Sequence, residues 1–282
     1  MTVKRVGIVG SGIMGSGIAE VAAKAGFEVC LRSRQQSSAD SMMAGLEKSL
    51  GKQVDKGKLD AGERDAVLGR VTTVTDLGEL AECNLVIESI VEDLAIKKHL
   101  FNELDRVCND GAVLATNTST LPVVEMAMES RPERVCGVHF FNPAPMMPLV
   151  EVVRCITTSD ETVETARGFA EACGKSPVLV RDQAGFIVNA LLFPYLNNAV
   201  KLLDAGVATR DDIDAAMKGG CNFPMGPLEL LDLVGLDTSL AIIEALYAEF
   251  RDPNYAPAPL LRRMVSAERL GRKSRHGFYD YT

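Results

Sequence analysis

The sequence predicts an α/β domain followed by an all-α domain. Short apolar runs rich in β-branched residues alternate with helical patterns as far as Val180, which is typical of a doubly wound parallel sheet. Beyond Val180 the strand-like runs stop, and helical patterns dominate the remainder of the 282 residues. We therefore expect two domains, at residues 1–183 and 184–282.

Strands of the first domain are expected where apolar, β-rich runs end at turn residues or glycines. They fall at residues 3–9, 29–31, 71–74, 85–88, 113–116 and 135–139, with similar runs at 149–153 and 178–180. Helices of the second domain are expected where apolar residues recur at helical spacing. They fall at residues 184–204, 210–218 and 228–250.

Residues 37–68 are too many for one simple connection between two strands. A lysine-rich middle around Gly57 divides the segment, so we expect a helical hairpin inserted into the first domain. The hairpin carries a basic cluster of Lys48, Lys52, Lys56 and Lys58. This cluster could bind a phosphate-bearing ligand, or it could simply be a solvated surface.

A glycine-rich turn joins the first strand to the first helix. Gly10, Gly12 and Gly15 have the spacing that permits a tight bend, close approach of a pyrophosphate and close packing of helix on strand. The N-terminus of the following helix attracts phosphate charge. Such a turn can also bind nothing, but the strand and helix around it predict a Rossmann-type dinucleotide site that includes Ile13 and Met14.

The second strand lacks the acid that usually binds the adenine ribose. No acidic residue lies between Glu28 and Asp40, and Arg32, Ser33 and Arg34 occupy the end of the strand. A carboxylate here would repel a 2′-phosphate, whereas an arginine would bind it. We therefore expect NADP(H) rather than NAD(H). The alternative is two solvated arginines, with Ser33 tolerating NAD.

Composition excludes several classes of function. The net charge of −8 argues against a nucleic-acid partner, and no apolar run is long enough to span a membrane. The seven cysteines have no CxxC spacing, which favours a reducing compartment over disulfides and leaves no recognisable metal site. A cytoplasmic location is the expectation.

A histidine and a glutamate stand out among the expected strands. His139 ends a strand, and strand ends in open α/β sheets face the ligand crevice. Glu151 lies inside an apolar β-rich run, where an unpaired carboxylate would be costly to bury, so the two side chains could pair. Such a pair could take the proton of a hydroxyl during hydride transfer, or it could be a structural hydrogen bond.

A set of motifs spans essentially the whole chain. They are VGIVGSGIMGSGIAE, LVIESIVED, LATNTSTLP, HFFNPAP, LVEVV, GFIVNALLFPYLNNAV, PMGPLELLDLVGLD and GRKSRHGFYDY. In combination they resemble the short-chain L-3-hydroxyacyl-CoA dehydrogenase family, which includes bacterial 3-hydroxybutyryl-CoA dehydrogenases.

The resemblance implies roles for four residues. His139 matches the general base, and Glu151 matches the carboxylate that orients it and stabilises its protonated form. Asn189 matches an amide that positions base and substrate, and Ser119 matches a hydroxyl beside the reacting oxygen. Without the family, Asn189 could cap or bridge neighbouring helices, and Ser119 could be a turn or N-cap residue before Leu121 and Pro122.

The resemblance also implies binding residues. Those for the cofactor are Glu92, Lys97, Asn117, Asn142 and Lys273, and those for the thioester are Ser49 and Lys56 beside Ser119 and Asn189. Glu92 and Lys97 could instead be a solvated ion pair at a helix start.

The implied reaction interconverts a 3-hydroxyacyl-CoA, with 3-hydroxybutyryl-CoA as the expected case, and the 3-oxoacyl-CoA, here acetoacetyl-CoA. NADPH would favour the reductive direction. A homodimer through the C-terminal helices is also implied. Two alternatives stay open: a dehydrogenase of hydroxyacyl groups on an acyl carrier protein, and a non-catalytic dinucleotide-binding protein.

Overall fold

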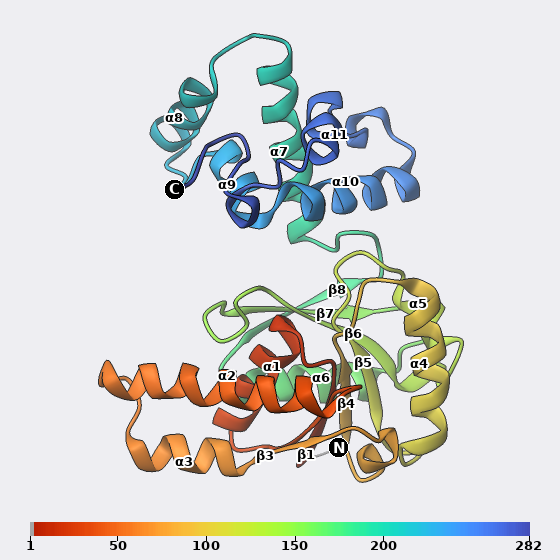
Figure 1. The fold of residues 1–282 in the computed structure, drawn as a ribbon. Helices are drawn as coiled ribbons and strands as arrows, with labels where there is room; N and C mark the ends of the chain where they lie inside the picture. Colours follow the sequence, from red (N-terminus) through yellow and green to blue (C-terminus); the bar gives the residue numbers. More distant parts are fainter. Residues whose placement is uncertain (1–2) are drawn as a thin grey trace. The chain divides into compact units, whose positions relative to one another are not determined.

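The computed structural model describes residues 3–282. The chain divides into two compact units, Met1–Asp182 and Gln183–Thr282, each with an apolar core of its own (Figure 1). None of the helices among the described residues is long and apolar enough to cross a membrane.

The first unit is built on one eight-stranded sheet of order β3-β2-β1-β4-β5-β6-β7-β8. The strands are β1 (Arg5–Val9), β2 (Glu28–Arg32), β3 (Val71–Val74), β4 (Leu85–Glu88), β5 (Val113–Thr116), β6 (Val135–Phe140), β7 (Leu149–Arg154) and β8 (Ser176–Arg181). The helices are α1 (Ile13–Lys24), α2 (Gln36–Asp55), α3 (Ala61–Gly69), α4 (Leu94–Val107), α5 (Val123–Ala127) and α6 (Asp160–Ala172). Short 3-10 helices lie at Leu77–Leu80 and Pro132–Arg134.

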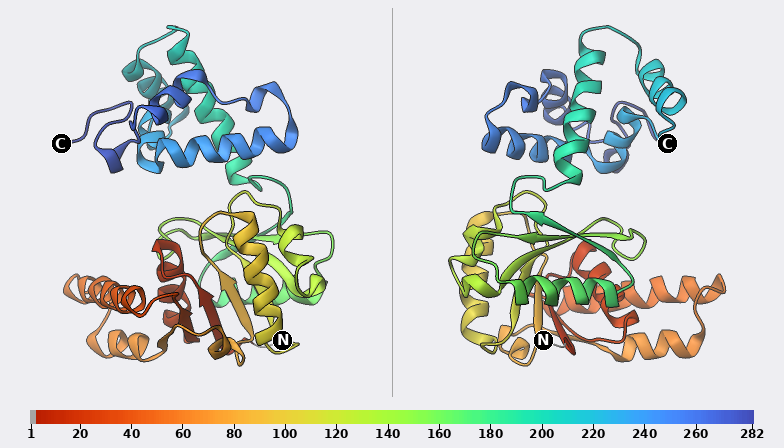
Figure 2. Two further views of the ribbon diagram at one scale, coloured as in Figure 1. Left: turned by 45° about the vertical axis from the view of Figure 1, so that its right-hand side comes forward. Right: turned by 180° about the vertical axis from the view of Figure 1, so that it is seen from behind.

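Helices cover both faces of the sheet. Figures 1 and 2 show α1 and α4 on opposite sides of the central strands. Buried residues of α1, α2 and α6 form one core with the sheet, including Ile18, Met42 and Phe169. The α/β fold expected from the sequence is therefore confirmed.

The sheet is not parallel throughout, which corrects the sequence-based expectation. The strands β1 to β6 pair in parallel, but β7 runs antiparallel to β6, and β8 is parallel to β7. Residues 141–148, which join β6 to β7, are too few for a crossover helix, because parallel connections need roughly a dozen residues or more. The chain must therefore turn back beside β6.

The expected helical hairpin is present as α2 and α3. Gly57, at φ +65°, lies in the turn between them, and Asp60 begins α3 with a capping box to Glu63. All four lysines of the basic cluster are exposed on the hairpin. The hairpin extends away from the sheet in both views (Figure 2).

The second unit consists of helices. They are α7 (Val188–Asp204), α8 (Arg210–Cys221), α9 (Pro227–Val234), α10 (Leu236–Phe250) and α11 (Pro259–Ser266), with 3-10 turns at Pro253–Tyr255 and Arg272–Ser274. Two sequence-based expectations are corrected here. The helix expected from residue 184 begins at Val188, because Gly185 and Phe186 have positive φ angles of 73° and 50°. The helix expected at 228–250 is two helices, broken at Gly235, whose φ is 102°.

Candidate active site

The turn between β1 and α1 shows which glycines the fold itself requires. A Cβ at Gly10 would lie 2.4 Å from the carbonyl oxygen of Ser89, and one at Gly15 would lie 1.8 Å from that of Gly10. A Cβ at Gly12 would meet nothing within 4 Å. Packing therefore explains Gly10 and Gly15, whereas Gly12 keeps open space beside the helix N-terminus.

That helix N-terminus is suited to an anion. Gly12 is the N-cap of α1, no side chain caps it, and the first turn holds no acidic residue. The first N–H groups of a helix have no partners within it and carry its positive dipole end. Ile13 is exposed at the start of α1, and Met14 is half-buried. These features fit the pyrophosphate of a dinucleotide.

The end of β2 presents one tethered and one exposed arginine. Arg32 is half-buried and donates from Nε to the carbonyl oxygen of Thr75 at 3.1 Å, whereas Arg34 is exposed. Ser33 is buried, and its Oγ lies 2.9 Å from Oγ of Ser11 in the glycine turn. The hydroxyl of Ser33 thus connects β2 to the turn, which leaves the arginines as the charged groups at this strand end.

His139 and Glu151 are paired by the reversal of β7. The antiparallel register sets the two residues directly opposite each other on β6 and β7. His139 Nδ1 lies 2.7 Å from Oε2 of Glu151, and both residues are buried, at 4% and 1% exposed. The pairing considered from the sequence is therefore present in the structure.

Ser119 extends this pair into a chain of three residues. Its Oγ lies 3.1 Å from Nε2 of His139. An ionised Glu151 can only accept hydrogen bonds, so it places the proton of a neutral imidazole on Nδ1 and leaves Nε2 as an acceptor. Nε2 is then the atom that can take a proton.

The alternative interpretation of Ser119 as a helix cap is wrong. The following helix, α5, begins at Val123, and the carboxylate of Asp182 accepts from the N–H groups of Val123 and Val124, both at 2.9 Å. Burial raises the pKa of Asp182 above its ordinary value, while these two hydrogen bonds oppose the rise. Ser119 is therefore not the N-cap of α5, and its Oγ contacts His139.

Asn117 holds neighbouring strand ends together. Its Oδ1 accepts from the N–H of Phe140 at 2.8 Å, and its Nδ2 donates to Oγ of Ser89 at 3.3 Å. These contacts join the carboxyl ends of β4, β5 and β6, where ligands bind in open α/β sheets. Asn142 follows β6 and is exposed.

Glu92 and Lys97 do pair, but only one partner is solvated, because Glu92 has 39% of its side chain exposed whereas Lys97 is buried. Lys97 is 1% exposed, and its Nζ lies 2.6 Å from Oε1 of Glu88 and 3.3 Å from Oε2 of Glu92. Glu88 is fully buried at the end of β4. Sequence reasoning missed Glu88, although an acid that ends an apolar strand is a signal in itself.

A groove of about 760 Å³ lies between the start of α1 and one side of α2. Its lining includes Gly12 and Ser16 on one wall and several serines of α2, among them Ser41 and Ser49, on the other. Ser49 donates to a carboxylate oxygen of the buried Glu20 at 3.1 Å. Lys56 is exposed at the C-cap of α2.

Two expected site residues lie in the helical unit. Asn189 is buried in the first turn of α7. Lys273 is exposed in the C-terminal 3-10 turn and pairs with Asp237. Burial alone would raise the pKa of the Asp237 carboxyl. The contact with Lys273 and hydrogen bonds from backbone N–H groups outweigh that effect and lower the pKa.

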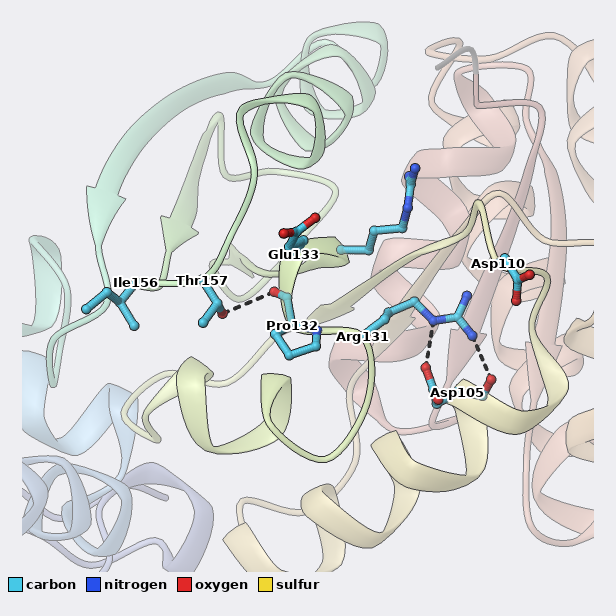
Figure 3. A pocket seen from close by; sticks show the side chains of 8 residues that line it. Asp105, Asp110, Arg131, Pro132, Glu133, Ile156 and Thr157 are labelled. Atoms are coloured by element: carbon cyan, nitrogen blue, oxygen red, sulfur yellow. Dashed lines mark hydrogen bonds and ion pairs between the residues drawn. The ribbon is translucent and has the colours of Figure 1, made fainter.

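A second hollow, of about 780 Å³, has a structural explanation. Arg131 in its wall donates to Oδ1 of Asp105 at 2.7 Å and to the carbonyl oxygen of Asp105 (Figure 3). It also donates to the carbonyl oxygen of Cys108, at the C-terminal end of α4. Thr157 donates to the carbonyl oxygen of Pro132 across the same hollow. Arg131 and Thr157 thus satisfy the end of a helix and a loop.

Known proteins match the chain along its whole length. Residues 5–183 match the family model described as "3-hydroxyacyl-CoA dehydrogenase, NAD binding domain", and residues 185–281 match "3-hydroxyacyl-CoA dehydrogenase, C-terminal domain". The 3-hydroxybutyryl-CoA dehydrogenase of Mycobacterium tuberculosis is 48% identical, with 99% of both chains covered. That of Clostridioides difficile is 47% identical, over 98% of this chain and 99% of the relative.

Solved structures agree with these relatives. The crystal structure of M. tuberculosis FadB2 has a TM-score of 0.97 and 48% identity, and the match covers 100% of both chains. The structure of (S)-3-hydroxybutyryl-CoA dehydrogenase PaaH1 from Ralstonia eutropha also has a TM-score of 0.97, with 39% identity and 100% of both chains covered.

Proposed function

The chain belongs to the 3-hydroxyacyl-CoA dehydrogenase family, and we propose that it interconverts (S)-3-hydroxybutyryl-CoA and acetoacetyl-CoA, with NADP(H) preferred over NAD(H). The observation that carries the proposed chemistry is the chain from Ser119 through His139 to Glu151, with contacts of 3.1 and 2.7 Å. It supplies a buried base whose accepting atom is defined. This base lies near the carboxyl ends of the parallel strands, where ligands bind in open α/β sheets.

In the oxidative direction, Nε2 of His139 takes the proton of the 3-hydroxyl while C3 gives up its hydrogen with the bonding pair. When bound, the nicotinamide ring accepts or returns that hydride. Glu151 keeps the imidazole in orientation and balances the positive charge that forms on it. In the reductive direction, the protonated imidazole returns its Nε2 proton to the 3-oxo oxygen, and the same geometry serves both directions.

Ser119 and Asn189 complete the proposed catalytic set. The hydroxyl of Ser119 lies beside Nε2, and once Nε2 has taken the substrate proton this hydroxyl is free to donate to the oxygen of the reacting carbon. Asn189 lies in the helical unit, and its role as a positioning amide rests on the resemblance of the surrounding motif. Asn189→Ala should lower kcat and leave dinucleotide affinity unchanged.

The proposed dinucleotide site uses the glycine turn for the pyrophosphate and the arginines of the second strand for the 2′-phosphate. Arg32 is held by Thr75, and Ser33 by Ser11, so both residues have fixed contacts, and the chain carries no acid between Glu28 and Asp40. Asn117, Asn142, Glu92, Lys97 and Lys273 are the other residues assigned to this site on the resemblance. Steady-state kinetics with NADH and NADPH on acetoacetyl-CoA test the preference, and a clear preference for NADH would refute it.

The serine-lined groove is the proposed site for part of the coenzyme A moiety. Ser49 gives its proton to Glu20, so its oxygen is left to accept from an amino or hydroxyl group of the ligand. Lys56 offers a charge for a phosphate. Competition between CoA thioesters and carrier-protein thioesters tests the carrier, and faster turnover of the carrier-protein substrate would favour the alternative in which the hairpin lysines bind an acidic protein.

A homodimer formed through the helical unit is also proposed. Large apolar side chains are exposed on that unit, including Leu191 at 71% and Phe223 at 42%. Exposed large apolar side chains of this kind would be buried at a subunit interface, where such residues are common. Light scattering on the purified protein should give twice the mass of one chain, and the mass of a single chain would exclude the dimer. The cytoplasmic location remains a prediction.

A further inference from the structure

Four polar side chains join α1 to α2 beside the serine-lined groove. We propose that Glu20, at their centre, is a positioning residue for the thioester: it fixes Ser49, and with it α2, against α1. This inference rests on the proposed function, because it concerns the groove proposed for part of the coenzyme A moiety. We call Glu20, Lys24, Ser49 and Gln53 the helix bridge.

Glu20 accepts three hydrogen bonds, and two of them come from α2. Its Oε2 accepts from the hydroxyl of Ser49 at 3.1 Å, and its Oε1 accepts from the amide of Gln53 at 2.9 Å. The third donor is Lys24, one turn further along α1, whose Nζ lies 2.7 Å from Oε1. Glu20 is buried, with 4% exposed, so its charge needs these partners.

Lys24 and Gln53 complete a closed ring with Glu20. Nζ of Lys24 also donates to the side-chain oxygen of Gln53 at 2.7 Å. The amide of Gln53 therefore accepts from Lys24 through its oxygen and donates to Glu20 through its nitrogen. Each member of the ring has two partners within it, so the carboxylate that faces Ser49 is held in one orientation.

The helix α2 carries two glycines around the bridge. Gly45 and Gly51 lie inside the helix, where glycine lowers helix propensity. Ser49 and Gln53 are one turn apart, and they contact Glu20 on either side of Gly51. The bridge thus supports α2 where its own sequence is weak, and Gly45 lines the groove next to that point.

Packing does not require a charged group at this place. The apolar face of α2 is buried through Met42, Leu46 and Leu50, which belong to the core of the first unit. Replacing a buried ion pair by apolar side chains is often neutral or stabilising. Glu20 and Ser49 both line the groove, however, and a fixed hydroxyl matters where a ligand contacts it.

The test compares two thioesters on the full-length enzyme. Acetoacetyl-CoA carries the nucleotide part of coenzyme A, whereas acetoacetyl-N-acetylcysteamine carries the same reacting group without it. We expect Glu20→Ala to raise KM for acetoacetyl-CoA by about three- to tenfold, the usual effect of one hydrogen bond. KM for the truncated thioester, kcat, and dinucleotide affinity by fluorescence titration should each stay within twofold, because His139 and its partners lie outside the bridge.

Three further variants separate positioning from loss of fold. Ser49→Ala and Glu20→Ala combined should have the KM of Ser49→Ala alone, because Glu20 acts through Ser49. Glu20→Gln keeps the length of the side chain and an acceptor oxygen, and it should recover most of the lost affinity. Gln53→Met removes two contacts of the ring and should raise KM for acetoacetyl-CoA alone, which keeps the inference testable if Glu20→Ala does not fold.

Glu47→Ala is the matched control, because Glu47 is an exposed acid on the same helix. Both substitutions remove one negative charge, and that change by itself favours binding of the anionic coenzyme A. A rise in KM that is confined to Glu20→Ala therefore reports the contact with Ser49 rather than the change of charge.

Three results would overturn the role of the helix bridge: an unchanged KM for acetoacetyl-CoA in Glu20→Ala, equal rises for the two thioesters, or effects of Glu20→Ala and Ser49→Ala that multiply. Each is compared with a wild type that has a lower KM for acetoacetyl-CoA than for the truncated thioester. Equal KM values in the wild type would instead refute the groove as the coenzyme A site, and absent turnover would refute the proposed reaction, so these failures are distinct.

Discussion

His139 is the residue on which the proposed chemistry depends most. Its two ring nitrogens have different partners, Glu151 on Nδ1 and Ser119 on Nε2. The carboxylate defines which nitrogen carries the proton, so Nε2 is left to exchange a proton with the substrate oxygen.

His139→Ala should lower kcat for acetoacetyl-CoA by about 10²- to 10⁴-fold, because that is the usual contribution of a positioned acid or base. Dinucleotide affinity should stay unchanged, because the glycine turn is untouched. Steady-state kinetics and fluorescence titration measure the two effects. His99→Ala is the control, since His99 is on the surface with 77% of its side chain exposed. Full turnover by His139→Ala would refute the mechanism.

Ser33 is the position that tests cofactor choice. Ser33→Asp would place a carboxylate where Ser33 now contacts Oγ of Ser11, 2.9 Å away, and that hydroxyl can donate to it. The new charge would bind the ribose hydroxyls of NAD and repel a 2′-phosphate. We expect KM for NADPH to rise by about tenfold or more while KM for NADH falls. An unchanged ratio of the two would show that selection lies elsewhere.

At the scale of elements, the turn between β1 and α1 combines two demands. Gly10 and Gly15 are needed because backbone atoms approach where a Cβ would lie, and Gly12 is set against open space at the helix end. Gly10 and Gly15 thus serve the packing of the helix on the strand, and Gly12 leaves room for the ligand. A GxGxxG motif therefore reports the fold as much as the cofactor.

Gly15→Ala should displace α1, because its Cβ would lie 1.8 Å from the carbonyl oxygen of Gly10. We expect a loss of about 1–3 kcal/mol in the free energy of unfolding, as for other overpacked sites, together with weaker dinucleotide binding. Gly168→Ala is the matched control, because Gly168 is exposed in α6 and its new Cβ would meet nothing within 4 Å. The free energy of unfolding of Gly168→Ala, measured with urea, should rise by about 0.5–1 kcal/mol. Equal effects of the two substitutions would contradict the packing argument.

The reversal of β7 is the element-scale event that forms the site. A short connection after β6 turns the chain back, and the antiparallel register then sets His139 opposite Glu151. A shift of one residue in that register would turn one of the two side chains to the other face of the sheet. The pair is thus a consequence of strand order and loop length rather than of any local motif.

At the scale of the whole molecule, each unit has a separate apolar core. The core of the first unit extends from β1 and α1 to α6, and that of the second lies among α7 to α11. The division falls between Asp182 and Gln183. Units with cores of their own can fold independently.

A fragment of residues 1–182 should therefore unfold cooperatively and bind NADPH, because the sheet and the glycine turn lie entirely within it. It should not turn over acetoacetyl-CoA, because it lacks Asn189 and the rest of the helical unit. Circular dichroism during urea unfolding, fluorescence titration and an activity assay measure these three properties. A non-cooperative transition or absent NADPH binding would contradict the independence of the unit.

Much of this organisation was predictable from sequence, and the errors have physical causes. The strands at 71–74, 85–88 and 113–116 are found as expected, because buried parallel strands are continuous apolar runs. The helix expected at 228–250 was broken by Gly235, whose positive φ the apolar pattern did not reveal. The helix expected to begin at residue 184 begins at Val188 instead, because Gly185 and Phe186 also have positive φ angles that the apolar pattern does not reveal.

The sequence by itself determined the dinucleotide-binding turn, the alternation of strands and helices, the acid-free end of the second strand and the family, because each depends on residue types at short, fixed spacings. Only the tertiary structure decided that β7 reverses, that Glu151 faces His139, that Ser119 serves His139 rather than a helix cap, and that Glu88 and Lys97 form a buried pair. These contacts join residues far apart in the chain, and the packing of the sheet, not the local pattern, brings them together.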